Sequence, residues 1–267
     1  MTSLVLESRN NGVLTLTLNR PESLNSLSNE MMESLLSVLQ KASRDSETGC
    51  VILTGAGRGF CAGGDVKGMA DRNSSKPEGH QTMEDRANGL RASMEISRIL
   101  HTMPKPVIAM VNGPAAGAGF SLALACDIRV AGESAMFTTA FARVGFSGDF
   151  GGSYFLTKIV GTALARELFF TAQRLDSRQA LELGIVNHAV KDDQLLQFTF
   201  DMAERIASGP KIAYEYMKRN LNAAESGTLE QVFDLEAWHM TRTGMTEDHR
   251  EAAKAFVEKR EPVFKGK

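Results

Sequence analysis

Two glycine-rich turns, each directly after a stretch of buried-strand character, constrain this chain more than any other feature. The first turn, Gly55–Asp65, follows the apolar run Cys50–Thr54, and the second, Gly113–Gly119, follows Val107–Val111. Continuous apolar runs of this length are typical of strands covered on both faces in a parallel sheet. One such turn most often only supplies positive φ angles, but two of them predict convergent sets of unshielded backbone N–H groups.

The turns match neither of the common glycine-rich phosphate sites. The sequence Gly55-x-Gly57-x-x-Phe60 lacks the third glycine of a dinucleotide fingerprint, and GxxxxGK[ST] does not occur in the chain. Two backbone N–H groups aimed at one position can instead hold a carbonyl oxygen as it becomes an enolate oxygen. The sequence therefore predicts an oxyanion hole.

The remaining pattern predicts an α/β core followed by helices alone. Besides the two buried runs, we expect strands at Val13–Asn19, Ile128–Val130 and Leu183–Val186, and helices after a cap at Ser28, through Leu90–Leu100, at Ser121–Cys126 and at Thr162–Ala172. The polar stretch between Met69 and Arg86 is typical of a mobile surface loop. Beyond about Gln194 the signals are helical only, at 204–207, 212–221, 228–241 and 249–258. We therefore divide the chain into a core, 1–194, and a helical region, 195–267.

The composition of the chain argues against several classes of binding partner. The 267 residues carry 30 lysines and arginines against 32 acidic residues, so no broad positive field is available for nucleic acid or an anionic membrane. Three cysteines without a CxxC pair favour neither disulfides nor zinc, and the five histidines are isolated, so we expect no metal. With no apolar run of about 18 residues and no apolar stretch after Glu7, we expect a cytoplasmic protein without a membrane partner.

Several motifs together closely resemble the crotonase superfamily, that is, enoyl-CoA hydratases and isomerases. The motifs are Arg20-Pro21-x-x-x-Asn25-x-Leu27, Gly59-Phe60-Cys61-Ala62-Gly63-Gly64-Asp65, Ala109–Gly119, Cys126-Asp127 and the terminal Ala255-Phe256-x-x-Lys259-Arg260-x-Pro262-x-Phe264-x-Gly266-Lys267. The resemblance covers the whole chain. It implies a spiral of ββα repeats with a helical C-terminal region that builds a homotrimer or a dimer of trimers.

The resemblance also implies a substrate and the residues that meet it. The substrate is an acyl-CoA thioester, with no other cofactor, and the oxyanion hole is formed by the N–H groups of Gly64 and Ala118. In this family, basic residues that match Lys259 reach the CoA phosphates from a neighbouring subunit. The residues carried over as substrate-binding are Asn25, Ala62, Gly63, Asp65, Gly117, Phe141, Phe256 and Lys259. We expect Asp65 and Asp127 to tie the backbone rather than to catalyse.

The chain departs from the hydratase pattern at both catalytic glutamates. By the resemblance these positions are Ser121 and Phe141, which have no useful acid–base chemistry near neutral pH, so hydration by two carboxylates cannot run from them. Asp149, eight residues later, is similar to the aspartate of dienoyl-CoA isomerases, of ring-1,2-epoxyphenylacetyl-CoA isomerases and of chlorobenzoyl-CoA dehalogenases. The second group also has phenylalanine at the position of Phe141.

Asp149 has two interpretations. It could cap a helix over Phe150–Leu156, or it could be the one base of the site. A helix N-terminus would favour its ionised form, whereas apolar neighbours such as Phe141, Phe146 and Phe150 would raise its pKa by desolvation. The sequence alone leaves the balance open.

The leading hypothesis is an acyl-CoA isomerase in which Asp149 moves a proton while Gly64 and Ala118 hold the enolate. A hydratase that pairs Asp149 with a loop carboxylate such as Glu84 is the alternative. A thioester hydrolase or dehalogenase is third, because it needs a histidine where the chain has Met94 and because His101 is out of register by about two helical turns. A non-catalytic acyl-CoA binder is fourth.

Two other residues are weaker candidates for the site. Cys61 lacks an adjacent base, and Glu95 is more typical of a solvated helix face.

Overall fold

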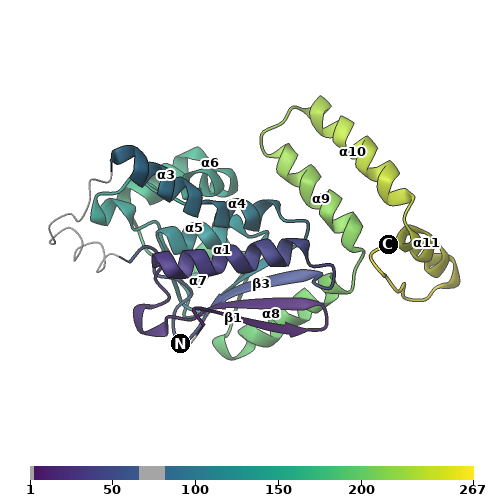
Figure 1. Cartoon of the computed structure of the whole chain (residues 1–267), viewed down its shortest axis with the longest axis horizontal. Helices are drawn as coiled ribbons and strands as arrows, with labels where there is room; N and C mark the ends of the chain where they lie inside the picture. Colours follow the sequence, from purple (N-terminus) through teal and green to yellow (C-terminus); the bar gives the residue numbers. More distant parts are fainter. Residues whose placement is uncertain (1–2, 66–81) are drawn as a thin grey trace.

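The computed structural model describes residues 3–65 and 82–267. Its main feature is a six-stranded sheet, two strands of which, β1 and β3, are labelled in Figure 1. The strand order is β1-β2-β3-β4-β6-β9; β1 is antiparallel to β2, and every other pair is parallel. The strands are Val5–Asn10 (β1), Val13–Leu18 (β2), Cys50–Gly55 (β3), Val107–Val111 (β4), Ile128–Gly132 (β6) and His188–Val190 (β9).

The central strands β3 and β4 are buried on both faces, whereas the edge strand β1 is mostly exposed, and the side chains of the central strands alternate between two cores. In β3, Val51 and Leu53 face one core while Cys50 and Ile52 face the other. The first core is closed by helices α1 (Asn29–Arg44), α4 (Glu95–Thr102) and α5 (Ala118–Ala125), and the second by α8 (Asp192–Ala207). A strand that is covered on both sides needs no polar face, which explains its continuous apolar sequence.

A second, smaller sheet completes a repeating path. Its strands are Pro114–Ala116 (β5), Met136–Thr138 (β7) and Leu175–Asp176 (β8), in the order β5-β7-β8. Twice the chain passes from the main sheet to the small sheet and then to helix: β4, β5, α5, and then β6, β7, the short η2 (Phe141–Val144) and α6 (Gly152–Thr171). A bridge between Cys61 and Ala115 adds the turn after β3 to the same edge. This is the spiral of ββα repeats that the resemblance implies.

Most of the predicted elements are confirmed, with three differences. The strand expected at Leu183–Val186 is wrong: Leu183 caps helix α7 (Ser177–Glu182), and Ile185 and Val186 are buried without being strand residues, so their apolar character reflects burial alone. Of the predicted loop between Met69 and Arg86, residues 69–81 lie outside the described residues, and α3 (Met83–Ser93) already begins at Met83 after the capping box of Thr82. Strands β1 and β9, the small sheet and helix α7 were not predicted.

The helices after α8 extend away from the sheets (Figure 1). They are Lys211–Ala224 (α9), Leu229–Gly244 (α10) and Glu247–Glu258 (α11), and no described strand follows β9, as expected. We call α9 to α11 with the tail 259–267 the C-terminal arm. α8 itself packs on the main sheet through Leu195, Ala203 and Ala207. The division of the chain at 194/195 stays a prediction.

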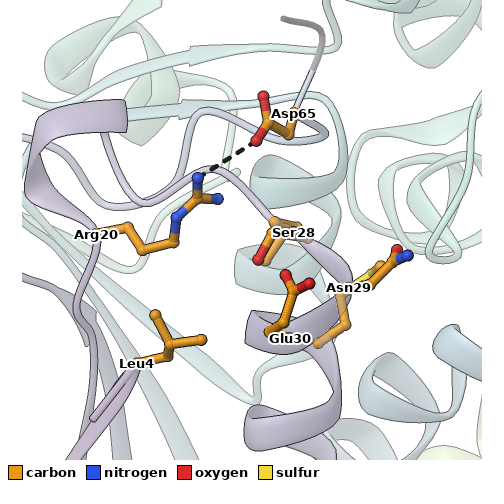
Figure 2. Close-up of a pocket in the computed structure, with 8 residues that line it drawn as sticks. Leu4, Arg20, Ser28, Asn29, Glu30 and Asp65 are labelled. Carbon is orange, nitrogen blue, oxygen red and sulfur yellow. Dashed lines mark hydrogen bonds and ion pairs between the residues drawn. The ribbon is translucent and has the colours of Figure 1, made fainter. Parts of the chain in front are cut away.

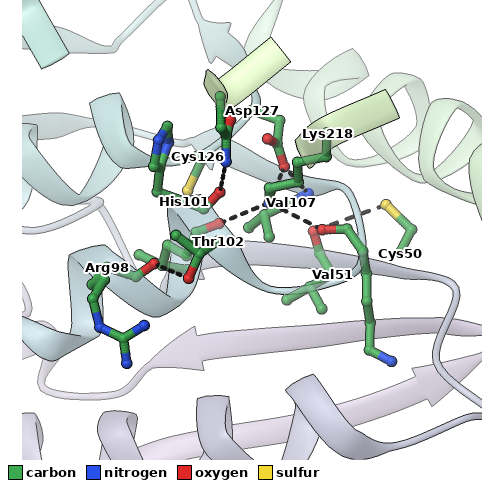
Figure 3. Close-up of polar contacts among 12 residues, drawn as sticks. Cys50, Val51, Arg98, His101, Thr102, Val107, Cys126, Asp127 and Lys218 are labelled. Carbon is green, nitrogen blue, oxygen red and sulfur yellow. Dashed lines mark hydrogen bonds and ion pairs between the residues drawn. The ribbon is translucent and has the colours of Figure 1, made fainter. Parts of the chain in front are cut away.

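A buried ion pair fixes the base of the arm to the core (Figure 3). The ammonium group of Lys218, in α9, lies 2.7 Å from Asp127 and donates to the carbonyl oxygens of Leu100 at 2.9 Å and Lys105 at 3.1 Å. Asp127 also accepts from the N–H of Val107, at 2.7 Å. Asp127 therefore ties the start of β4 to α9, as the sequence suggested.

Replacing Lys218 with methionine is expected to destabilise the protein by about 3 kcal/mol, because it leaves the Asp127 charge without its partner. The free energy of unfolding, measured with urea, tests this. Lys254→Met, in which an exposed lysine is removed, is the control and is expected to change stability by less than about 0.5 kcal/mol. Asp127→Asn combined with Lys218→Met should regain part of the loss; a double variant that is no more stable than Lys218→Met would contradict this account.

Candidate active site

The two glycine-rich turns, Gly55–Asp65 and Gly113–Gly119, are in direct backbone contact. The N–H of Ala116 donates to the carbonyl oxygen of Cys61 at 3.0 Å, and the N–H of Cys61 donates to the carbonyl of Pro114 at 3.1 Å. A Cβ atom on Gly119 would overlap the carbonyl oxygen of Cys61, and one on Gly63 would lie 2.6 Å from the carbonyl oxygen of Ala116. Glycine is required at both places because the two backbones approach too closely for a side chain.

The N–H groups of Gly64 and Ala118 have no hydrogen-bond partner within the described part of the chain. Gly64 bridges to Leu27, but its neighbour Gly63 supplies the carbonyl oxygen that accepts from the Leu27 N–H, at 2.8 Å. Ala118 is the first residue of α5, where the N–H has no acceptor inside the helix. The Cβ position of Gly63 lies 3.3 Å from the nitrogen of Ala118, so the two groups belong to adjacent segments.

The buried amide side chain of Asn25 stabilises the first glycine turn. Asn25 is completely buried; its Nδ2 donates to the carbonyls of Ala56 at 2.9 Å and Gly59 at 2.7 Å, and its Oδ1 accepts from the N–H of Arg20. The resemblance implies that Asn25 binds substrate. In the structure its side-chain amide forms hydrogen bonds with backbone groups, so Asn25 stabilises the conformation of the first turn. Ala62 is fixed beside it, since its N–H donates to the carbonyl of Leu24 at 2.9 Å.

Asp65, at the end of the first turn, faces a cavity of about 390 Å³ (Figure 2). Its carboxylate pairs with the guanidinium of Arg20 at 3.3 Å, and Glu30 lines the same cavity. Asp65 therefore ties the turn to the segment before α1. Its expected contact with substrate stays a prediction, and the described lining of this cavity contains neither Ala118 nor Asp149.

The ring of Phe141 lies between the second glycine turn and the segment that carries Asp149. A Cβ atom on Gly117 would lie 3.6 Å from this ring, and one on Gly148 would lie 3.8 Å from it. Phe141 is buried and stacks on Phe169, with ring centroids 5.9 Å apart. One aromatic side chain therefore lies beside both the second glycine turn and the residue before Asp149.

Asp149 sits in a turn of unusual backbone conformation. Gly148, Phe150 and Gly151 all have positive φ angles, of 116°, 49° and 78°. Helix α6 begins only at Gly152, with Gly151 at the N-cap and no side-chain cap, so the capping role considered for Asp149 is wrong. The Oδ1 atom of Asp149 is buried and has no hydrogen-bond partner among the described residues. A strained, non-glycine left-handed residue beside a buried, unpaired carboxyl is typical of a functional turn.

Burial raises the pKa of Asp149 from 3.8 to about 6. Desolvation is the cause, and it outweighs any help from the start of α6, which begins three residues later. Phe150 is buried, whereas the Phe146 side chain is 56% exposed and shields little. A carboxyl with a pKa near 6 is ionised at neutral pH yet basic enough to remove a proton.

The alternative groups are engaged elsewhere or inert. Burial raises the pKa of the Cys61 thiol to about 12, which removes it as a nucleophile. Glu95 pairs with Arg91 and Arg98, which lower its pKa, as on a solvated helix face. Glu84 is exposed in the first turn of α3.

His101 packs on Phe155, with ring centroids 5.1 Å apart, and lies 3.7 Å from Glu225 of the arm. Phe155 in turn fills the space beside Gly151, so it stands between His101 and the Asp149 turn. Phe256 is 86% exposed and Lys259 ends α11 in the arm. Neither residue joins the glycine turns within one chain.

Within residues 3–65 and 82–267, no group of three histidine, cysteine, aspartate or glutamate side chains is arranged to hold a metal ion. In the same residues, none of the helices combines the length and hydropathy needed to cross a bilayer.

A family model described as enoyl-CoA hydratase/isomerase matches residues 8–267. The chain belongs to this family. It is 40% identical to the 1,2-epoxyphenylacetyl-CoA isomerase of Escherichia coli K12, over the full length of both chains. It is 34% identical to the short-chain-enoyl-CoA hydratase of Clostridium acetobutylicum, covering 97% of this chain and 96% of the other.

The fold of the family is confirmed by solved structures. A crystal structure of an enoyl-CoA hydratase from Polaromonas sp. JS666 matches with a TM-score of 0.90 and 34% identity, covering 98% of this chain and 99% of that one. An enoyl-CoA hydratase from Bacillus anthracis matches with a TM-score of 0.91 and 31% identity, covering 99% of this chain and 100% of the other. The crotonase resemblance and the predicted spiral fold are therefore correct.

Asp149→Asn is expected to stabilise the protein in a pH-dependent way. Because the folded-state pKa lies above the unfolded one, the stability from the protonated carboxyl is fully present below about pH 3.8 and is lost as the pH rises through about 6. Asparagine keeps the neutral form. The gain is expected to be about 3 kcal/mol at pH 8 and about 1.5 kcal/mol at pH 5, from the size of the pKa shift.

Urea unfolding at the two pH values measures this difference. Asp193→Asn, at an exposed position in α8, is the matched control and should change stability equally at both pH values. A pH-independent effect of Asp149→Asn would show that the carboxyl is solvated in the folded protein.

Proposed function

We propose that this protein is an acyl-CoA isomerase that shifts a double bond by moving one proton with Asp149. The proposal is carried by the Asp149 carboxyl, whose buried Oδ1 atom lacks a hydrogen-bond partner among the described residues, as do the N–H groups of Gly64 and Ala118. The Phe141 ring connects the two regions, since it lies beside both Gly117 and Gly148. The thioester oxygen would be held by the N–H groups of Gly64 and Ala118. Gly63 and Gly117 would let the thioester approach the backbone, and Ala62 and Phe141 would flank it.

The reaction balances with one base. With a 3-enoyl thioester, the Asp149 carboxylate removes a proton from C2, and the electron pair of that C–H bond moves through the carbonyl to give a dienolate. The new negative charge on oxygen is stabilised by the two N–H groups, each worth about 3–4 kcal/mol in such sites. Asp149, now protonated, returns the proton to C4, and the double bond comes to lie between C2 and C3.

The site supports isomerisation over hydration. Hydration in this family, as the resemblance implies, uses two carboxylates, and the chain has Ser121 and Phe141 at those positions. Glu84, the carboxylate considered as a second acid, is exposed at the start of α3. Hydrolysis through an aspartyl ester is also disfavoured, because His101 contacts Phe155 and the arm.

For the substrate we propose an unsaturated or ring-derived acyl group. The relative that is 40% identical over the whole chain is named a 1,2-epoxyphenylacetyl-CoA isomerase. The aromatic pair Phe141 and Phe169 supplies a flat apolar wall that suits such a group.

We also propose that the arm builds a homotrimer or a dimer of trimers. No residue of α10 is buried within one chain, and the exposed apolar side chains of the arm include Trp238, Met240, Phe256 and Val257. In such an assembly Phe256 and Lys259 would serve the site of a neighbouring subunit. The cytoplasmic location stays a prediction.

Asp149→Asn is expected to lower isomerase turnover of a 3-enoyl-CoA by at least a hundredfold, because the amide cannot accept the proton. Turnover is followed by the absorbance of the conjugated thioester product. Asp193→Asn is the control and should retain wild-type turnover. Full activity of Asp149→Asn would rule out the proposed base.

The pH dependence of kcat/KM provides an independent test. Because the carboxyl must be ionised to take the proton, kcat/KM is expected to be constant above about pH 7 and to fall tenfold per unit below about pH 6. A profile that stays flat down to pH 4.5 would contradict a buried carboxyl with a raised pKa as the base.

A further inference from the structure

Ser121 lies in the first turn of α5 and is buried, with 1% of its surface exposed. Its N–H and its hydroxyl both donate to the carbonyl oxygen of Gly117, at 3.0 Å and 3.2 Å. That carbonyl belongs to the same peptide group as the N–H of Ala118. The hydroxyl therefore acts on one side of the peptide whose other side faces the proposed thioester oxygen.

A hydrogen bond to a peptide oxygen polarises the whole amide group. It draws electrons toward oxygen and makes the N–H a stronger donor. The hydrogen bond that this N–H donates is strengthened by about 10–30%. Serine hydroxyls commonly donate to the carbonyl four residues earlier in a helix. What distinguishes Ser121 is that the N–H of the accepting peptide has no partner in the described residues.

Ser121 also contacts the other half of the site. A Cβ atom on Gly152 would overlap the Ser121 hydroxyl oxygen, so glycine is needed there to seat it. The N–H of Gly152 donates to the carbonyl oxygen of Asp149 at 3.0 Å. One small side chain therefore separates the second glycine turn from the turn that carries the proposed base.

We propose that Ser121 is a positioning residue that polarises the Gly117–Ala118 peptide and sets its spacing from the Asp149 turn. The inference rests on the proposed function and adds a role for a side chain that takes no proton from substrate. It explains how a residue without acid–base chemistry at neutral pH contributes at the centre of this site.

The test is the carbonyl stretching frequency of bound butyryl-CoA labelled with ¹³C at the thioester carbon, measured by difference infrared spectroscopy. This saturated thioester has no double bond to move. In the wild-type protein the band is expected to shift to lower frequency on binding. Ser121→Ala should reduce that shift and lower kcat with a 3-enoyl-CoA by about three- to tenfold, with KM changed less than twofold.

Two further variants complete the experiment. Ser121→Cys places a weaker donor where the hydroxyl was and should give an intermediate band. Ser97→Ala removes another buried hydroxyl, one without a partner among the described residues, and should leave band and kcat unchanged. A wild-type band in Ser121→Ala, or an equal change in Ser97→Ala, would overturn the inference.

Asp149→Asn separates this inference from the proposed function. It should abolish turnover while leaving the carbonyl shift intact, because both N–H donors remain. If Asp149→Asn retained turnover, the proposed base would be wrong, whereas the band of Ser121→Ala would still decide the role of the hydroxyl.

Discussion

The carbonyl oxygen of Cys61 lies where the side chain of any residue but glycine would begin at position 119, and the rest of the site depends on this close approach. It brings the turn after β3 against the start of α5 without a side chain between them. The bridge from Cys61 to Ala115 then extends the contact into the small sheet. In these two segments the N–H groups of Gly64 and Ala118 have no partner among the described residues, and we propose that a ligand oxygen accepts from them.

The carboxyl beside these groups is held in an unfavourable state. Left-handed backbone at Phe150 and burial of the Asp149 oxygen both oppose folding, and neither is offset by a hydrogen bond to that oxygen in the described residues. The surrounding packing supplies the difference, with Phe141 stacked on Phe169 on one side and Ser121 seated against Gly152 on the other. The cost in stability accompanies a carboxyl whose pKa is raised to about 6, as the proposed base requires.

The sequence predicts the core because each buried strand carries an apolar run and each turn carries glycine at contact positions. It also places Asp149 beside phenylalanines. It does not predict the two- and three-residue strands of the small sheet, since pairs such as Leu175–Asp176 are too short for any periodicity. Nor does it show that Ile185 is buried in a loop, because an apolar residue has the same pattern in either setting. The sign of the Asp149 pKa shift depends on distances that only the folded chain supplies.

The most direct measurement is a crystal structure of the protein with an unreactive acyl-CoA. The account predicts the thioester oxygen within about 2.7–3.1 Å of the nitrogens of Gly64 and Ala118. It also predicts the Asp149 carboxyl turned toward C2 and C4 of the acyl chain. A thioester oxygen bound by other groups, or an Asp149 carboxyl directed into solvent, would contradict it.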